Sequence, residues 1–453
     1  MYNLISKLIL YSNLSSDSVL SELSAVCAEL KGTVPVSSLE GVSLYADNGS
    51  RKVDTDALTA RVYAQVKKIL DTATSFGFNK NLWHDYLTFR IISDQNSFSL
   101  TCEGNGAQEG GSVNSFALND FRIFRALFDY DFSFIQKKLD INCFDVLQNY
   151  SAIEKEARLY DRNVSSIIRS LSDALAASAD ENEFFDLISD HYRKYGVGMF
   201  GLNRAFRIKG TGDSLEFIPV INADPITLDD LVGYERQKET LRAATLGFCR
   251  GQKSNNVLLY GDAGTGKSSS IKAVLNEYFG MGLRMIEIYK DQFCDLSNVI
   301  ARLKKRNYRF IIYIDDLSFE ENEVEYKFLK AVIEGGVENR PDNVLIYATS
   351  NRRHLIKETW KDRADMEHDG DIHRSETMEE KLSLSSRFGI TINYPNPVKQ
   401  EYNEIVLALA HRAGIGMDDD TLIAEANKWE LRHGGPSGRA ARQFVNHIAV
   451  LEE

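Results

Sequence analysis

The sequence predicts an α/β fold in its second half, a parallel sheet with helices on both faces, together with a carboxy-terminal helical lid and a mainly α amino-terminal domain. Three observations lead to this fold class. Apolar residues recur at helical spacing up to about residue 200. Short apolar runs alternate with helical patterns beyond residue 225, and the chain is helical again after Pro395 and Pro397.

The length of 453 residues exceeds one ordinary core and predicts several domains. We expect a helical domain over 1–200, a linker over 201–225, a nucleotide-binding domain over 226–396 and a helical lid over 397–453. Hydrophobic residues make up 43% of the chain and charged residues 26%, which is typical of globular proteins and argues against global disorder.

The charge and the cysteines restrict the class of protein. The formal net charge is -12 without a long basic run, so a permanent electrostatic grip on nucleic acid is not favoured, although conditional binding through a small patch stays open. The five cysteines form no Cys-x-x-Cys pair, which argues against a disulfide framework and a zinc site. No apolar run is long enough to span a membrane. These features predict a cytoplasmic protein.

The first two hundred residues have the pattern of amphipathic helices. One run places Leu58, Val62 and Ile69 at helical spacing before Gly77 ends it. The glycine-rich stretch 102–114 predicts a loop. No catalytic constellation occurs here, so we interpret this half as a domain that binds an unknown protein partner or packs on the second half.

A phosphate-binding loop follows the predicted strand NNVLLYG and precedes a predicted helix. Its glycines allow backbone N–H groups and the helix amino terminus to point at phosphate oxygens. Lys267 would neutralise the outer phosphates, and the Ser268 hydroxyl would ligate Mg²⁺. A plain glycine turn is the alternative, which the strand, loop and helix order disfavours. The predicted nucleotide-binding residues here are Gly261, Asp262, Ala263, Gly264, Thr265, Gly266, Lys267, Ser268 and Ser269.

Two later strands end in polar residues. The run FIIYI is followed by Asp315, predicted to order the magnesium shell, and by Asp316, predicted to act as general base. The run NVLIYATS is followed by Asn351, predicted to reach the γ-phosphate or the attacking water. The alternative interpretation of the two aspartates is a buried strand that meets a turn. The alternative for Asn351 is a helix cap or a turn former.

With the later segments LSLSSRFG and GGPSGRAARQF, this ordered set of motifs resembles the AAA+ ATPases. More closely, residues from about 201 onward resemble predicted bacterial ATP-binding proteins described as domain of unknown function 815. The resemblance implies an ATP- and Mg²⁺-dependent ATPase that acts as a homo-oligomer. It implies that Arg387 is an arginine finger acting in trans, that Arg439, or Arg442 in its place, senses the nucleotide from the lid, and that Val232 and Gly233 border the adenine. Taken singly, such arginines are more often surface groups.

Two features depart from the family pattern. Many AAA+ enzymes have glutamate where this chain has Asp316, which predicts slow hydrolysis unless Glu320 or Glu321 compensates. The polar stretch 352–380 contains a Glu367 to His373 cluster whose spacing matches no standard metal site, so we expect a mobile loop.

Three functions fit these observations. The first is an oligomeric motor that remodels a macromolecule. The second is an ATP-dependent switch with little hydrolysis, and the third is a DNA-associated loader, which the acidic charge does not favour.

Overall fold

The computed structural model describes residues 1–16, 18–32, 54–103, 106–107, 110–152, 162–221, 223–319, 323, 325–334, 341–351, 355 and 384–452. The chain divides into two compact units, Met1–Asn203 and Arg204–Glu453. In the described residues, no helix is both long and apolar enough to cross a membrane. The stretch 352–380 lies outside the described residues except for Leu355, and Glu320 and Glu321 lie outside them too.

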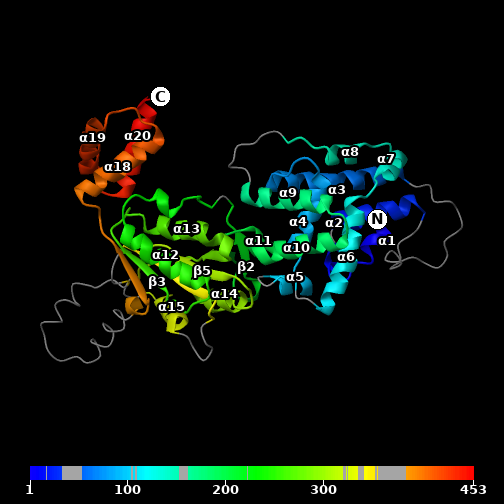
Figure 1. The fold of residues 1–453 in the computed structure, drawn as a ribbon, viewed down its shortest axis with the longest axis horizontal. Coiled ribbons are helices and arrows are strands. Elements are labelled where there is room, and N and C mark those ends of the chain that lie inside the picture. The colour runs from blue at the N-terminus through cyan, green and yellow to red at the C-terminus, as the bar shows by residue number, and fades with distance from the viewer. Residues whose placement is uncertain are drawn as a thin grey trace. The chain divides into compact units, whose positions relative to one another are not determined.

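The first unit is mainly α, as predicted (Figure 1). The expected run of apolar residues forms a helix that Asp54 caps at its start and Gly77 ends in the left-handed conformation, with Leu58, Val62 and Ile69 buried. Its helices are α1 (Tyr2–Ile5), α2 (Ser18–Leu30), α3 (Thr55–Phe76), α4 (Leu82–Ser93), α5 (Ser97–Cys102), α6 (Ser112–Phe128), α7 (Ser133–Leu139), α8 (Cys143–Gln148), α9 (Arg162–Ala177), α10 (Glu181–Tyr195) and α11 (Gly198–Leu202).

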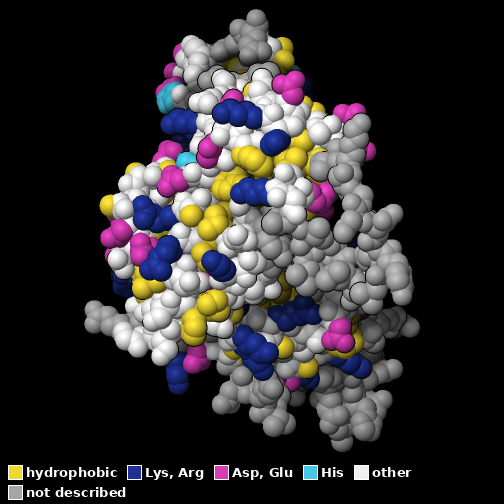
Figure 2. Space-filling view, turned by 90° about the vertical axis from the view of Figure 1, so that its right-hand side faces the viewer, with side chains coloured by type: hydrophobic (Ala, Val, Ile, Leu, Met, Phe, Trp, Pro, Cys, Tyr) yellow, Lys and Arg dark blue, Asp and Glu magenta, His cyan; other side chains and the backbone are white. Residues whose placement is uncertain are grey.

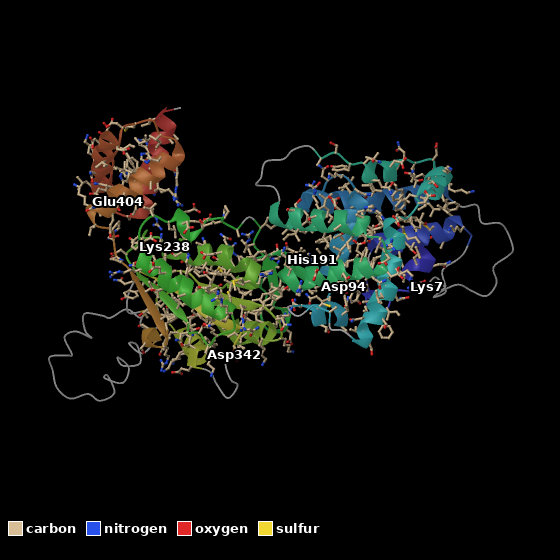
Figure 3. All side chains as sticks on the ribbon, in the orientation of Figure 1. Lys7, Asp94, His191, Lys238, Asp342 and Glu404 are labelled. Atoms are coloured by element: carbon tan, nitrogen blue, oxygen red, sulfur yellow. The ribbon has the colours of Figure 1, made fainter. Side chains whose placement is uncertain are left out.

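Hydrogen bonds to buried side chains help to organise this unit. The Trp83 indole donates a hydrogen bond to the Leu127 carbonyl at 2.7 Å, and the Asp120 carboxylate accepts the N–H groups of residues 9–11. His191 of α10 is labelled in Figure 3, and burial lowers its pKa to about 3.

Figure 2 shows hydrophobic side chains beside lysines and arginines on one face of the molecule. The exposed large apolar residues of this unit include Ile9, Tyr63, Leu100, Phe116 and Val146.

The second unit contains a seven-stranded sheet in the order β2-β1-β4-β5-β6-β3-β7. Neighbouring strands are parallel except β1 and β2. Its strands are β1 (Ala205–Lys209), β2 (Glu216–Pro219), β3 (Val257–Gly261), β4 (Leu283–Glu287), β5 (Arg309–Ile314), β6 (Val344–Ser350) and β7 (Ile390–Tyr394).

The segment 201–225, which we expected to be a linker, contains two strands of the sheet. This segment supplies β1 and β2, and β1 pairs in parallel with β4 from Ala205 to Arg207. The backbone groups of β1 therefore find their partners in a strand some eighty residues away. Because that pairing is non-local, the short apolar alternation of the segment did not reveal that it extends the sheet.

Helices cover both faces of the sheet. The chain crosses from β3 to β4 over two intervening strands through α13 (Lys267–Tyr278), then steps back to β5 and β6 through α14 (Leu296–Leu303) and α15 (Glu325–Glu334). Right-handed crossovers in opposite directions place α13 on one face and α14 and α15 on the other, as Figure 1 shows. Helix α12 (Glu235–Cys249) packs beside α13. The carboxyl ends of the parallel strands thus lie at one edge of the sheet.

The chain ends in a helical lid, formed by α18 (Lys399–Ala413), α19 (Asp419–Arg432) and α20 (Gly438–Glu452). These helices have an apolar core of their own, in which Tyr402, Val406 and Phe444 are buried. The structure therefore confirms the predicted fold class: a parallel α/β sheet with a helical carboxy-terminal region and a mainly α amino-terminal unit.

Candidate functional site

The glycine-rich loop joins β3 to α13 with three glycines at positive φ. Gly261, Gly264 and Gly266 have φ values of 134°, 77° and 91°. A Cβ atom at Gly261 would lie 2.2 Å from the Tyr394 carbonyl oxygen, so only glycine fits between β3 and β7. The loop leads directly into the amino terminus of α13, whose free N–H groups favour an anion.

Lys267 lies in the first turn of α13, and its side chain folds back over the loop. Its Nζ donates hydrogen bonds to the carbonyl oxygens of Gly261 and Asp262, at 2.9 and 2.6 Å, and to Asn351 Oδ1 at 3.1 Å. Burial lowers the pKa of Lys267, whereas nearby carboxylates, that of Asp262 first, act in the opposite direction. The ammonium group is thus held at the floor of the loop, against the end of β6.

Ser268 and Asp315 meet at the end of β5. Ser268 Oγ donates to Asp315 Oδ1 at 2.7 Å, and Thr349 Oγ1 donates to the same oxygen at 2.6 Å. Desolvation alone would raise the pKa of Asp315, but the hydrogen bonds from Thr349 and Ser268 outweigh it, and its pKa lies below the ordinary value. Asp315 is therefore an ionised oxygen donor beside the Ser268 hydroxyl at neutral pH.

Asp316 has a left-handed backbone conformation, with φ of 49°. Its N–H donates to Thr349 Oγ1 at 2.9 Å, and its Oδ1 accepts a hydrogen bond from Asn351 Nδ2 at 2.8 Å. A non-glycine residue in this region costs of the order of 1 kcal/mol and persists where its surroundings hold it. Asn351, which follows β6, thus links Asp316 to Lys267.

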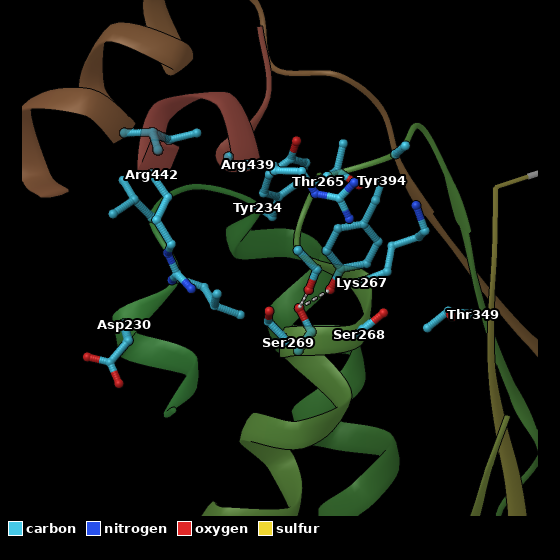
Figure 4. A pocket seen from close by; sticks show the side chains of 18 of the residues that line it. Asp230, Tyr234, Thr265, Lys267, Ser268, Ser269, Thr349, Tyr394, Arg439 and Arg442 are labelled. Carbon is cyan, nitrogen blue, oxygen red and sulfur yellow. Dashed lines mark hydrogen bonds between the residues drawn. The ribbon is translucent and has the colours of Figure 1, made fainter. Parts of the chain in front are cut away.

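These side chains line one pocket of about 590 Å³. Figure 4 shows Lys267 and Ser268 in the loop, with Arg439 and Arg442 on the lid side. Of the predicted site residues, Val232, Ala263, Gly264, Thr265, Gly266, Lys267, Ser268, Ser269, Asp315, Asp316, Asn351 and Arg439 line it. Gly261, Asp262, Gly233 and Arg387 do not.

The lid closes one side of the pocket. The Arg439 N–H donates to the Gly264 carbonyl at 3.1 Å, and Arg442, one turn further along α20, also lines the pocket. Ile405 and Leu409 of α18 face the same space as Val232. Sequence reasoning missed these two apolar residues, because nothing local to α18 distinguishes them from its core residues.

Two aromatic residues, Tyr234 and Tyr394, lie beside the loop. The Tyr234 and Tyr394 rings stack with centroids 5.1 Å apart and an interplanar angle of 30°. The Tyr234 hydroxyl donates to the Pro395 carbonyl at 2.7 Å. Gly233 has φ of 79° and lies between the pocket residues Val232 and Tyr234, so it shapes this border through its backbone.

Arg387 lies outside the pocket. It follows a short helical turn before β7, and its guanidinium forms an ion pair with Glu334 at the end of α15. The side chain is 25% exposed. Arg387 is therefore not among the residues of this chain that line the pocket.

Thr349 was also missed from the sequence, although it is 2% exposed and holds both aspartates. Its only signal was its position two residues before Asn351, at the end of an apolar strand. The hydroxyl, carboxylate and amide groups around it form a set of oxygen donors. Such donors suit a hard cation such as Mg²⁺, and Ser268 and Asp315 would hold it.

A family model described as "Protein of unknown function (DUF815)" matches residues 202–451. The replication factor C large subunit of Nanoarchaeum equitans is 38% identical over 64 residues, which make up 14% of this chain and 14% of that protein. Among solved structures, the Thermotoga maritima RuvB Holliday junction branch migration motor is similar with a TM-score of 0.35 at 17% identity, covering 50% of this chain and 66% of that one. A variant of the same protein gives a TM-score of 0.36 at 18% identity, covering 50% of this chain and 67% of the variant.

Proposed function

The chain belongs to the family of proteins of unknown function DUF815, and we propose that its second unit binds ATP with Mg²⁺ and hydrolyses it. One observation carries this proposal. Lys267 at the start of α13, Asp315 after β5 and Asn351 after β6 converge in one pocket, although they are far apart in the sequence. A pocket of about 590 Å³ has the size of a small-molecule site.

The phosphate end of the pocket supports a triphosphate. The positive-φ glycines and the amino terminus of α13 supply N–H groups, and the Lys267 ammonium supplies a compact charge. Ser268 and Asp315 would hold Mg²⁺, which neutralises charge on the phosphate oxygens when it is bound. The lowered pKa of Asp315 keeps this ligand ionised at neutral pH.

Part of the pocket lining is apolar, and we call this part the base end. Val232 and, from the lid, Ile405 and Leu409 contribute to it, which favours a flat aromatic ring such as adenine. Arg439 and Arg442 of α20 also line the pocket, and a guanidinium there would contact phosphate oxygens.

Hydrolysis would use Asp316 to polarise the attacking water and Asn351 to orient it. We assign Arg387 to the active site of a neighbouring copy of this chain, since it does not line the pocket of its own. This assignment makes the protein a homo-oligomer whose turnover depends on contact between subunits. The first unit, with its exposed apolar side chains, would bind the protein partner on which such a cytoplasmic motor acts.

One observation favours a second candidate, an ATP-dependent switch with little turnover. The Asp316 carboxylate already accepts a hydrogen bond from Asn351, and its side chain is shorter than glutamate. If Asn351 keeps this contact with ATP bound, Asp316 activates water poorly. Phosphate release by the parent protein with Mg²⁺ distinguishes the two: sustained turnover selects the motor, and tight binding without turnover selects the switch.

The test of nucleotide binding is a titration with a fluorescent ATP analogue. We expect saturable binding by the parent and an affinity at least about 100-fold lower for Lys267→Ala, because the outer phosphates lose their charge partner. Lys253→Ala, which removes an exposed lysine from the loop before β3, is the matched control and should bind like the parent. A parent that fails to bind at millimolar nucleotide, or a Lys267→Ala protein with unchanged affinity, would overturn the proposal.

A further inference from the structure

Asp262 lies in the phosphate loop, but its carboxylate is bonded to the segment that precedes the lid. Its Oδ2 accepts the Asn396 N–H at 2.8 Å, and its own N–H donates to the Tyr394 carbonyl at 3.1 Å. Asp262 does not line the pocket, whereas residues 263–270 all do. The side chain that the sequence suggested as a nucleotide contact therefore points to the segment that connects β7 with α18.

That connecting segment has few groups by which it can be held. Pro395 and Pro397 have no N–H and a restricted φ, so between them only Asn396 offers a backbone donor. Asp262 accepts this donor, and on the other side the Tyr234 hydroxyl donates to the Pro395 carbonyl at 2.7 Å. A stiff segment that is anchored at two points passes a small shift of its anchor on to the helices that follow.

The backbone of Asp262 is tied to the lysine of the loop. The Asp262 carbonyl accepts hydrogen bonds from Lys267 Nζ at 2.6 Å and from Thr265 Oγ1 at 2.9 Å. A bound triphosphate draws the Lys267 ammonium toward phosphate oxygens and so competes with this carbonyl. Asp262 thus joins the group that responds to phosphate with the group that holds the hinge.

We propose that Asp262 is a positioning residue for the lid: through Asn396 it makes the placement of α18–α20 depend on phosphate in the loop. Arg439, whose N–H donates to the Gly264 carbonyl, is carried over the loop by the same movement. The inference rests on the proposed function, since it requires a nucleotide in the pocket. It adds a way in which nucleotide binding in the pocket changes the position of the lid.

A different role for the same carboxylate is electrostatic, because its charge also favours the protonated form of Lys267. Two substitutions separate these roles. Asp262→Asn keeps an oxygen that accepts the Asn396 N–H but removes the charge, whereas Asp262→Ala removes both. Positioning through the hydrogen bond predicts that asparagine rescues, and a purely electrostatic role predicts that it does not.

The experiment is hydrogen–deuterium exchange of the full chain with and without a non-hydrolysable ATP analogue and Mg²⁺. In the parent we expect nucleotide to slow exchange in the loop peptide 261–270 and in lid peptides from 399–452. In Asp262→Ala we expect protection of the loop alone and about tenfold faster exchange of the Asn396 amide, which has lost its acceptor. Asp262→Asn should behave like the parent.

The matched control is Asp418→Ala, which removes a carboxylate that caps α19 by accepting the Thr421 N–H at 3.0 Å. It weakens the lid away from the hinge and should keep nucleotide-dependent protection of the lid. Full lid protection in Asp262→Ala, or failure of Asp262→Asn to rescue, overturns the inference alone. A parent in which nucleotide protects neither segment overturns the proposed function and this inference with it.

Discussion

Thr349 Oγ1 lies 2.6 Å from Asp315 Oδ1 and 2.9 Å from the backbone nitrogen of Asp316. One buried hydroxyl on β6 therefore orients both aspartates that follow β5. It donates its hydrogen to the Asp315 carboxylate and accepts the Asp316 N–H on a lone pair of the same oxygen. This hydroxyl thus holds the Asp315 carboxylate and the backbone of Asp316, whereas the Asp316 carboxylate is held by Asn351.

Replacing Thr349 with valine keeps the shape of the side chain and removes the hydroxyl. We expect Mg²⁺-dependent activity, or Mg²⁺ affinity in the presence of nucleotide, to fall by about 10- to 100-fold, as for other groups that orient a metal ligand. The unsatisfied Asp316 N–H should also lower the free energy of unfolding by about 1–3 kcal/mol. Thr349→Ser keeps the hydroxyl and is the control. Equal Mg²⁺ titrations for the valine and serine variants would remove Thr349 from the site.

Arg387→Ala should bind ATP like the parent but turn it over about 1000-fold more slowly, the scale of an arginine finger. The decisive measurement is a mixture with Lys267→Ala, which has an intact Arg387 but a disabled phosphate loop. If Arg387 acts in trans, mixed oligomers contain some complete sites, and phosphate release exceeds the sum of the two variants alone. Arg122→Ala, which removes an exposed ion pair with Glu181 in the first unit, is the control. Strictly additive rates in the mixture would refute action between subunits.

Gly261→Ala should destabilise the second unit strongly. The added Cβ would lie 2.2 Å from the Tyr394 carbonyl oxygen, and φ of 134° is unsuited to an L-residue, so β3 and β7 must separate. We expect a loss of more than about 2 kcal/mol in the free energy of unfolding and loss of nucleotide binding. Gly280→Ala has no atom within 4 Å of the new Cβ and should unfold like the parent in urea. A parent-like urea midpoint for Gly261→Ala would contradict the tight pairing.

Asp85 makes the stability of the first unit depend on pH. Burial raises its pKa to about 6, partly opposed by a hydrogen bond from Ser172. Because the folded pKa exceeds the unfolded value of 3.8, the folded state holds the proton more tightly, and stability falls as pH rises from about 4 to 6. A shift of roughly two pKa units corresponds to about 3 kcal/mol.

Asp85→Asn cannot ionise and should lose this pH dependence. We expect the free energy of unfolding of the parent, relative to Asp85→Asn, to decrease by about 2–3 kcal/mol between pH 4 and pH 7. Urea titrations followed by tryptophan emission, to which Trp83 of the same helix contributes, measure this difference. An identical pH profile for the two proteins would show that Asp85 is not desolvated.

Much of the site was accessible from the sequence because its elements are local. Strand, glycine loop and helix follow one another within about twenty residues. Apolar periodicity indicates the strand and the helix, and the glycines indicate the loop. The aspartates after β5 and Asn351 after β6 were found for the same reason. In a parallel sheet, the carboxyl ends of neighbouring strands share an edge. The role of Arg387 between subunits is still a prediction.

The sequence by itself determined the fold class, the phosphate loop and the residue types that end the strands. Only the tertiary structure decided that residues 205–219 extend the sheet and that Thr349 bonds to both aspartates. It also decided that Ile405 and Leu409 line the pocket and that the Asp262 carboxylate accepts the Asn396 N–H. The physical reason is the distance along the sequence over which each interaction acts. Backbone conformation and amphipathic periodicity depend on near neighbours, whereas a hydrogen bond between distant segments exists only once packing has brought donor and acceptor together.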